Sequence, residues 1–393
     1  MSQQGDFKAE AQALRGRLVA WRRDFHMHPE LGFQEHRSAG VIAERLRGLG
    51  YRVQTEVAPT GVVGLLEGNR AGPVVMVRFD MDALPIAEEN ETDYVSQNPG
   101  VMHACGHDAH MAIGLGVAML MAQRRDAMAG TLKLIFQPGE EGMNGAEAMV
   151  ADGVLENPRP DVFLAAHVWN DVSVGIVDVT PGAVMAAAEK WSCTVRGSGG
   201  HGAMPHQTVD PVVAAAQIVT ALQTVVSRNV SPLETAVVTV GTIHGGDAFN
   251  IIPAEVEMSG TIRTFSPRVR EVVLQRVREL VEGVAASCGT TAELEIKPLT
   301  PAVINDAEVA EVARAAADAV VGPENVLSDE RTMGSEDAAF FLQEVPGCYL
   351  FLGSANAERG LDAPHHNPRF DIDEDVLPLG VAVLMHALAH YLL

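Results

Sequence analysis

Residues 74–82 read Val-Val-Met-Val-Arg-Phe-Asp-Met-Asp, a short apolar run that ends in two carboxylates. Such runs are typical of buried strands. Similar runs occupy 131–136 and 162–166, and segments with helical spacing cover about 109–124 and 145–151. Strands that alternate with helices indicate an α/β layer built on a largely parallel sheet that is buried on both faces.

The order of elements changes after Pro181. The pattern then predicts strand, helix, strand, strand, helix and strand, which is the βαββαβ order of a ferredoxin-like domain. These elements are expected at 187–196, 209–226, 236–243, 255–264, 267–287 and 292–297. We therefore expect an α/β domain of residues 1–182 and 298–393 that contains an inserted domain of residues 183–297.

Composition limits the classes of partner. The chain has 393 residues, with 28 Lys and Arg against 51 Asp and Glu, so its formal charge is −23. This excess of negative charge argues against binding to nucleic acid or to an anionic membrane. No apolar stretch is long enough to span a bilayer, and the first residues do not resemble a signal peptide. The sequence therefore predicts a cytoplasmic protein.

Residues that can bind metals follow the predicted strands, at the edge where open α/β sheets place their ligands. The groups are Asp80 and Asp82, the run His103-Ala-Cys-Gly-His-Asp-Ala-His110, the pair Glu140-Glu141, His167, and the pair His365-His366. Each group alone also has an ordinary explanation. Cys105 could be a half-buried cysteine beside a helix-capping Asp108, adjacent glutamates are usually solvated, and a histidine at a strand end is usually a core residue. Their coincidence favours a metal site.

Five segments resemble the aminoacylase and hippurate-hydrolase family of binuclear metal-dependent amidohydrolases, which includes the plant auxin-conjugate hydrolases. They are Asp80-Met-Asp-Ala-Leu-Pro85, the run from His103 to His110, Gln137-Pro-Gly-Glu-Glu141, Gly200-His-Gly-Ala-Met-Pro-His206 and Gly334-Ser-Glu-Asp337. They occur in the family's order between about residue 20 and the C-terminus, so the resemblance covers nearly the whole chain.

The resemblance implies two divalent ions, manganese or zinc, although cobalt or nickel also suits a mixed shell of nitrogen, oxygen and sulfur. It implies that Glu140 is the general base that takes a proton from the attacking water and returns it to the leaving amine. Asp80 and Asp82 are expected to orient ligands rather than to bind metal. The implied ligands are Cys105, His107, Glu141, His167 and His366.

The inserted domain holds a second set of implied site residues. His201 matches a histidine that stabilises the oxyanion from a facing subunit, and His206 is a weaker candidate for the same region. Asn250 and Arg263 match positions that hold a substrate carboxylate. By themselves, His201 could be a loop histidine and Arg263 a solvated charge at a strand end. If these residues act, the inserted domain is a lid or dimerisation domain and the protein is a homodimer or a dimer-based oligomer.

Two local features of the sequence are a glycine-rich segment and Asn170. The segment from Gly197 to Gly202 fits the string G-x-G-x-x-G, but no helix follows it directly and Pro205 intervenes, so a dinucleotide site is not expected. Asn170 stands where many close relatives have proline, which alters the expected pocket wall.

The function expected from the resemblance is hydrolysis of N-acyl or N-aroyl amino acids, such as hippurate, to a carboxylic acid and a free amino acid. One alternative is deacetylation of an N-acetylated diamino acid such as N-acetyl-diaminopimelate, or dipeptide cleavage, at the same metal site. Another is a non-catalytic metal-stabilised protein that binds a ligand. Glu140 beside Glu141 favours the enzyme, because a structural metal site needs no additional carboxylate.

Overall fold

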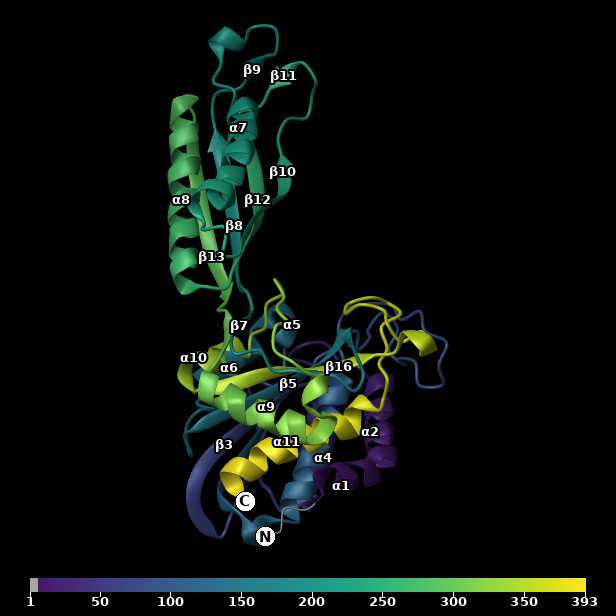
Figure 1. The fold of residues 1–393 in the computed structure, drawn as a ribbon. Helices are drawn as coiled ribbons and strands as arrows, with labels where there is room; N and C mark the ends of the chain where they lie inside the picture. Colours follow the sequence, from purple (N-terminus) through teal and green to yellow (C-terminus); the bar gives the residue numbers. More distant parts are fainter. Residues whose placement is uncertain (1–5) are drawn as a thin grey trace. The chain divides into compact units, whose positions relative to one another are not determined.

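The computed structural model describes residues 6–393, which form two compact units (Figure 1). Unit 1 contains residues 6–182, Ile304–Arg331 and Asp337–Leu393, and unit 2 contains Ala183–Val303 and Thr332–Glu336. The first junction coincides with the one expected from the sequence. The second lies later, because strand β13 (Thr291–Thr300) continues beyond residue 297.

Unit 1 is built on an eight-stranded sheet with the order β1-β2-β4-β3-β5-β16-β6-β15. Its central strands β4, β3, β5 and β16 run parallel, whereas β2 and β1 extend one edge in antiparallel fashion. The parallel centre confirms the predicted fold class. The strands are β1 (Arg52–Val57), β2 (Gly61–Glu67), β3 (Arg70–Asp80), β4 (Ala129–Gln137), β5 (Val162–Ser173), β6 (Val177–Asp178), β15 (Val326–Leu327) and β16 (Gly347–Ala355).

The helices of unit 1 pack on this sheet, and α4 is the most deeply buried of those that carry site residues. Every residue from His107 to Ala118 is buried, because α4 lies between β3, α2 and α11. A helix that is buried on all sides must be apolar all round, apart from polar residues that find partners. The principal helices are α1 (Phe7–Ala13), α2 (Arg15–Met27), α3 (His36–Gly48), α4 (His107–Ala122), α6 (Gly145–Ala151), α9 (Ala307–Val321), α10 (Ala339–Glu344) and α11 (Val376–Leu392).

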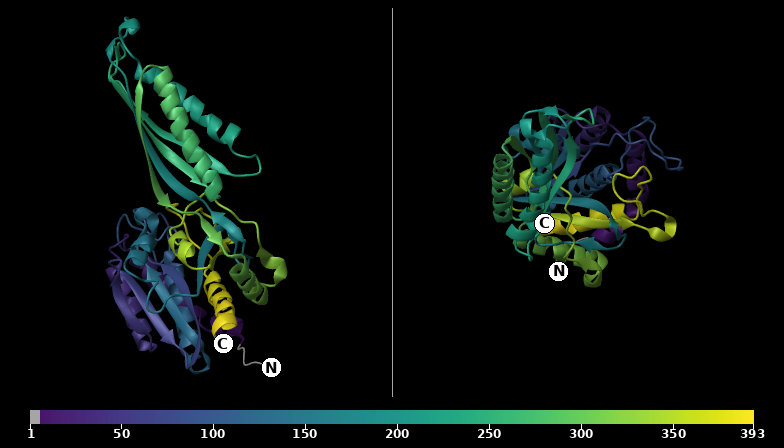
Figure 2. Two further views of the ribbon diagram at one scale, coloured as in Figure 1. Left: turned by 90° about the vertical axis from the view of Figure 1, so that its left-hand side faces the viewer. Right: turned by 90° about the horizontal axis from the view of Figure 1, so that it is seen from above.

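Unit 2 has the predicted βαββαβ order, and its antiparallel sheet is arranged β10-β12-β8-β13. Its two helices lie side by side on the sheet (Figure 2). The second helix, α8, packs on the sheet through one apolar face. The residues of this face recur every four positions and are all buried: Val269, Val273, Val277, Val281 and Ala285. The elements are β8 (Ala187–Arg196), α7 (Pro211–Thr224), β10 (Ala236–His244), β12 (Glu255–Thr264), α8 (Pro267–Ser287) and β13.

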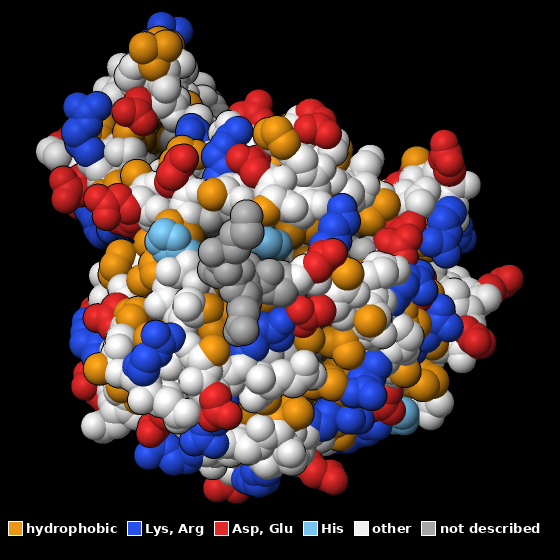
Figure 3. Space-filling model, turned by 60° about the horizontal axis from the view of Figure 1, so that its bottom comes forward, with side chains coloured by type: hydrophobic (Ala, Val, Ile, Leu, Met, Phe, Trp, Pro, Cys, Tyr) orange, Lys and Arg blue, Asp and Glu red, His pale blue; other side chains and the backbone are white. Residues whose placement is uncertain are grey.

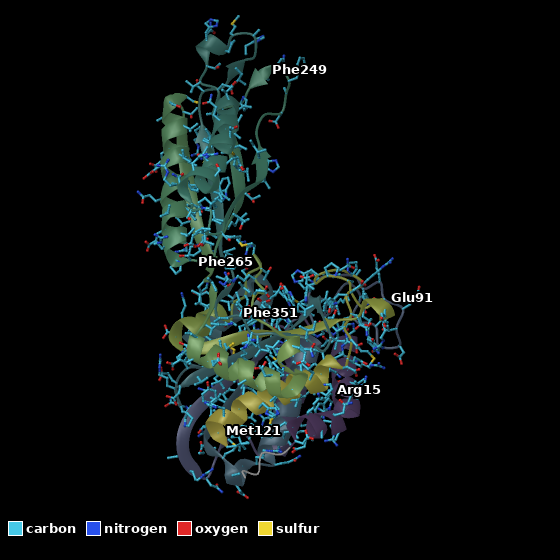
Figure 4. All side chains as sticks on the ribbon, in the orientation of Figure 1. Arg15, Glu91, Met121, Phe249, Phe265 and Phe351 are labelled. Carbon is cyan, nitrogen blue, oxygen red and sulfur yellow. The ribbon has the colours of Figure 1, made fainter. Side chains whose placement is uncertain are left out.

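At one end of unit 2, the short strands β9 (Gly200–His201) and β11 (Ile251–Ile252) pair with each other. Phe249, just before β11, is fully exposed and projects from this end (Figure 4). We call this end, residues 200–207 and 244–252, the tip of unit 2.

Two observations concern the surface. On the face shown in Figure 3, Lys and Arg side chains are interspersed with Asp and Glu, and they form no continuous basic stripe there. Within residues 6–393, no helix combines the length and the apolar character needed to cross a membrane.

Candidate metal centre

The candidate site lies where three neighbouring parallel strands of unit 1 end. β3 ends at Asp80, and β4 ends at Gln137, shortly before Glu140. β5 pairs with β3 only as far as Ala165, so His167 lies beyond the paired region. The topology therefore brings together residues that the sequence scatters over almost ninety positions.

Gly106 allows Cys105 and His107 to occupy one tight turn at the start of α4. Its φ angle is +85°, in the left-handed region that favours glycine. A Cβ atom at this position would lie 2.3 Å from Cγ2 of Val168, so the turn also has no room for a side chain. One possible ligand atom from each of Cys105, His107 and Glu141 lies within 4.8 Å of the others.

Asp82 orients two of these three residues. Nδ1 of His107 lies 2.9 Å from the backbone oxygen of Asp82, and the backbone N–H of Glu141 donates to Oδ2 of Asp82 over 2.9 Å. Nε2 of His107 and Oε1 of Glu141 are then left buried without a hydrogen bond. Oε1 of Glu141 lies 3.2 Å from Nε2 of His366, whose side chain is about half exposed. Nε2 of His107 lies 3.4 Å from Oδ2 of Asp80, so this nitrogen and Oε1 of Glu141 meet only ion-pair contacts, and this arrangement fits a metal ion bound between them.

His167 faces the same group. Its Nε2 lies 3.6 Å from Sγ of Cys105, and its Nδ1 lies 2.5 Å from the backbone oxygen of Val168. The structure thus brings together all the residues that the sequence predicts as ligands. Their roles as ligands stay predictions.

Asp80 lies beside the predicted ligands, and both of its carboxylate oxygens contact other side chains. NH1 of Arg78 donates to its Oδ2 over 2.8 Å, and Nδ1 of His110 lies 2.5 Å from its Oδ1. The backbone N–H of Val168 donates to Nε2 of His110, so His110 must carry its proton on Nδ1 and donate to Asp80. Both ring nitrogens of His110 are therefore engaged in hydrogen bonds within the protein. The carboxylate of Asp80 is held by His110 and Arg78, which agrees with a role in orienting ligands.

The turn after β4 separates the two glutamates. Gly139 and Gly142 have positive φ angles, and Glu141 has a non-helical ψ of 70° within the short helical turn α5 (Glu140–Met143). In this backbone, neighbouring side chains diverge, as the glycine spacing of the sequence suggests. Possible ligand atoms of Glu141 lie close to Cys105 and His107, whereas those of Glu140 lie close to Asp337, and the role of Glu140 as the base stays a prediction.

The field at the site favours cations. Burial alone would lower the pKa of His107, but Asp80 and Asp82 raise it to about 10. Burial raises the pKa of the Cys105 thiol, and the carboxylates of Glu141, Glu140 and Asp80 raise it further. The carboxylates contribute to both shifts, and bound divalent ions would neutralise this negative charge. The nitrogen, oxygen and sulfur donors therefore fit the two divalent ions implied by the resemblance.

Sequence reasoning missed three buried residues that support the site. Arg78 also donates to Oε1 of Gln137 over 2.7 Å, and Asp337 accepts from Nε2 of Gln137 over 2.7 Å. Glu35 accepts from the backbone N–H of Gly139 over 2.9 Å, directly before Glu140. An arginine inside an apolar strand was a signal for Arg78. Glu35 lies about a hundred residues from Gly139 and gave no such signal.

A buried charge network joins the start of α4 to the segment that follows His366. We call Arg22, His26, Glu88, Asp108, Asp371 and Glu374 the Arg22 network. Arg22 donates to Oδ2 of Asp108 over 2.8 Å and to Oδ1 of Asp371 over 2.6 Å. His26 lies 2.7 Å from Asp108 and 3.1 Å from Glu88. Burial would lower the pKa of His26, but Asp108 and Glu88 raise it to about 9.

The residues predicted in unit 2 form two separate groups. His201 and Asn250 are exposed at the tip, where Gly202 N–H donates to the Asn250 backbone oxygen over 2.8 Å, and His206 is exposed nearby. Arg263 lies near the other end of β12 and is half buried, with a buried NH1 that makes no hydrogen bond. Unit 2 by itself therefore does not bring Asn250 and Arg263 together.

Comparison with known proteins agrees with this geometry. Peptidase family M20/M25/M40 matches residues 76–390. The chain belongs to this family. The M20 chain is 38% identical over 371 residues to the N-acetylcysteine deacetylase of Bacillus subtilis, covering 93% of this chain and 94% of that protein. It is 37% identical over 390 residues to thermostable carboxypeptidase 2 of Saccharolobus solfataricus, covering 98% and 96%.

A solved structure supports both the fold and the metals. The Bacillus subtilis YXEP protein, described as a dinuclear metal-binding peptidase of the M20 family, matches with a TM-score of 0.84 and 33% identity. The match covers 96% of this chain and 98% of that one. This M20 chain is a metal-dependent amidohydrolase.

Proposed function

We propose that this M20 enzyme hydrolyses the amide bond of N-acyl or N-aroyl amino acids and releases a carboxylic acid and a free amino acid. The observation that carries the proposal is the convergence of possible ligand atoms of Cys105, His107 and Glu141, which lie within 4.8 Å of one another, beside Glu140. The similarity to an N-acetylcysteine deacetylase supports an acylated amino acid as the substrate class. Manganese or zinc is the proposed metal.

We assign separate roles to the metal ligands, the general base and Asp82. Cys105, His107, Glu141, His167 and His366 would hold two divalent ions, which when bound supply Lewis acidity to polarise the amide carbonyl and to acidify water. Glu140 removes a proton from the attacking water and delivers it to the nitrogen of the leaving amine. Asp82 keeps His107 and Glu141 in place during this transfer, because it holds both by hydrogen bonds.

Substrate recognition is assigned to unit 2. A guanidinium offers parallel donors that suit a carboxylate, and NH1 of Arg263 is buried without an acceptor. Arg263 is therefore the proposed anchor for the amino-acid carboxylate. Because His201 and Asn250 lie at the tip and Arg263 does not, we propose that His201 and Asn250 act on the substrate of a second copy in a homodimer.

The central test is Glu140→Gln in protein loaded with manganese or zinc. The amide keeps the size of the side chain but cannot accept the proton, so kcat should fall by roughly 10² to 10⁴-fold. Metal content, measured by atomic emission, should not change. The exposed Glu147 on α6 provides the control variant Glu147→Gln, which should keep full activity. Near wild-type turnover by Glu140→Gln would contradict the assignment of the base.

A second candidate is cleavage of a peptide bond, which the similarity to a carboxypeptidase favours. Hippurate, N-acetyl-methionine, N-acetyl-diaminopimelate and an unblocked dipeptide should be compared on metal-loaded protein, with chelated protein as the control. Preference for the first two supports the proposal. Preference for the dipeptide or for the diaminopimelate derivative would replace it with the corresponding alternative.

The proposed dimer has its own test. His201→Ala and Glu140→Gln should each be inactive alone, whereas a refolded mixture should regain activity. In a mixed dimer, one site would combine an intact Glu140 with His201 of the partner subunit. Failure to regain activity, with mixed dimers demonstrated by tag co-purification, would show that His201 acts within its own chain.

A further inference from the structure

One buried side chain holds both ends of the loop that carries His366. Asn170, on β5, is only 5% exposed. Its Nδ2 donates to the backbone oxygen of Ala363 over 2.9 Å and to that of Asp371 over 2.8 Å. Its Oδ1 accepts from Oγ of Ser354 over 2.6 Å. The side chain of Asn170 therefore ties residues 363 and 371 together at the base of the loop.

The backbone of Asn170 also determines where His365 carries its proton. The N–H of Asn170 points to Nε2 of His365, at a nitrogen-to-nitrogen distance of 3.2 Å. A backbone N–H can only donate, so Nε2 must be the unprotonated nitrogen. The ring is then neutral, with its proton on Nδ1.

Nδ1 of His365 faces Cys105. It lies 3.7 Å from Sγ of Cys105, and the backbone carbonyl of Cys105 also interacts with this imidazole. Both groups are acceptors, which agrees with a proton on Nδ1. The ring is fixed in this direction because it stacks on Trp169 at a centroid distance of 4.8 Å and packs on Phe370 at 4.9 Å.

We propose that His365 is a positioning residue that donates a hydrogen bond from Nδ1 to the sulfur of Cys105, and that Asn170 fixes this donor together with the loop of His366. The inference rests on the proposed metal site. A hydrogen bond to the sulfur of a metal ligand lowers the electron density that the sulfur gives to the metal. Residues that orient a ligand in this way often change the metal affinity by about 10 to 100-fold.

The test uses cobalt in place of the native metal, because cobalt bound to a thiolate shows a sulfur-to-metal charge-transfer band. In His365→Phe the band should move to lower energy, since the sulfur lone pairs lose their hydrogen bond. Cobalt should bind about 10 to 100-fold more weakly, because Cys105 is no longer held in its orientation. His365→Asn keeps an N–H at the position of Nδ1 and should retain the wild-type band. His365→Gln places its N–H at the position of Nε2 and should behave like His365→Phe.

Asn170→Ala separates the two roles of Asn170. This variant keeps the backbone N–H, so the energy of the band should stay at its wild-type value, while cobalt binding weakens because the loop of His366 is no longer tied. Circular dichroism should confirm that each variant is folded. An unchanged band in His365→Phe would overturn the proposal and assign the hydrogen bond to the Cys105 carbonyl. A wild-type protein without any thiolate band would instead overturn the metal site itself.

Discussion

The two units hold their predicted functional residues in opposite ways. In unit 1, His107, Asp82 and Asp80 are buried, and each is oriented by hydrogen bonds or close polar contacts. In unit 2, His201 and Asn250 are exposed at the tip. The difference teaches that a metal site must be shaped by the folded unit itself, because several ligands must converge on one point. Residues that meet a substrate can remain exposed until it arrives.

The largest expected effect on stability tests the close packing around Gly106 in unit 1. Gly106→Ala should destabilise the protein by about 2 to 5 kcal/mol, which combines left-handed strain with a clash against Val168. Gly289→Ala in unit 2 is the matched control, since Gly289 also has a positive φ but its nearest neighbour would lie 3.7 Å from the Cβ. Urea denaturation measures both. Equal losses would show that crowding at Gly106 does not matter.

The next prediction concerns pH and the Arg22 network. The pKa of His26 rises from 6.5 to about 9 in the folded protein. Its protonated form therefore adds stability that is complete below about pH 6.5 and is lost as the pH rises through 9, in total roughly 3 kcal/mol. The difference in unfolding free energy between wild type and His26→Gln should shrink between pH 6 and 10.

A histidine of unit 2 serves as the control for this measurement. His244 is exposed at the end of β10, so His244→Gln controls for the loss of an imidazole outside the Arg22 network. A constant difference between wild type and His26→Gln across the whole range would mean that His26 is not charged in the folded protein.

A smaller effect is expected on metal affinity, which should fall when a residue of unit 1 is replaced but not when a residue of unit 2 is replaced. Asp82→Asn should weaken metal binding by roughly 10 to 100-fold, because the carboxylate of Asp82 accepts from the backbone N–H of Glu141 and lies 3.3 Å from Nδ1 of His107. His201→Ala should leave the affinity unchanged, since its side chain is exposed in unit 2. Competition with a coloured chelator measures both variants. Equal weakening in the two variants would remove the distinction between the units.

The smallest effect addresses unit 2. Arg263→Ala should raise KM about tenfold for N-acyl amino acids, as expected for one charge-assisted contact, and should change KM little for the corresponding amides. Steady-state kinetics on matched acid and amide substrates measure this. The same increase for acid and amide would show that Arg263 supports the fold instead of binding the carboxylate.

Sequence patterns predicted the regular elements well where burial follows a clear period. The bounds of β8, β12 and α8 agree with the predicted ranges 187–196, 255–264 and 267–287. The edge strand β1 and its neighbour β2 were missed. β1 reads Arg-Val-Gln-Thr-Glu-Val and is mostly exposed, so it has no apolar run, and β2 contains a glycine that weakens the strand signal.

For the site, the sequence predicted a set of metal ligands but not most of the residues that orient them. Cys105 and His107 share one short motif, and each proposed ligand belongs to a residue type that binds metals. Glu35 and Asp337 are carboxylates whose partners lie far away in the chain, so only the folded structure reveals what they hold, although Asp337 belongs to one of the segments that carry the resemblance. The separation of Asn250 from Arg263 likewise depends on the length and direction of β12.

The Arg22 network has a consequence for how the enzyme is made. Arg22 and Asp371 are 349 residues apart in the chain, and His366 follows the other proposed ligands by about two hundred residues. Contacts between such distant segments form late in folding, since they close very long loops. A growing chain on the ribosome therefore has no complete metal site. We therefore expect both metal ions to be bound only after the whole chain has been made.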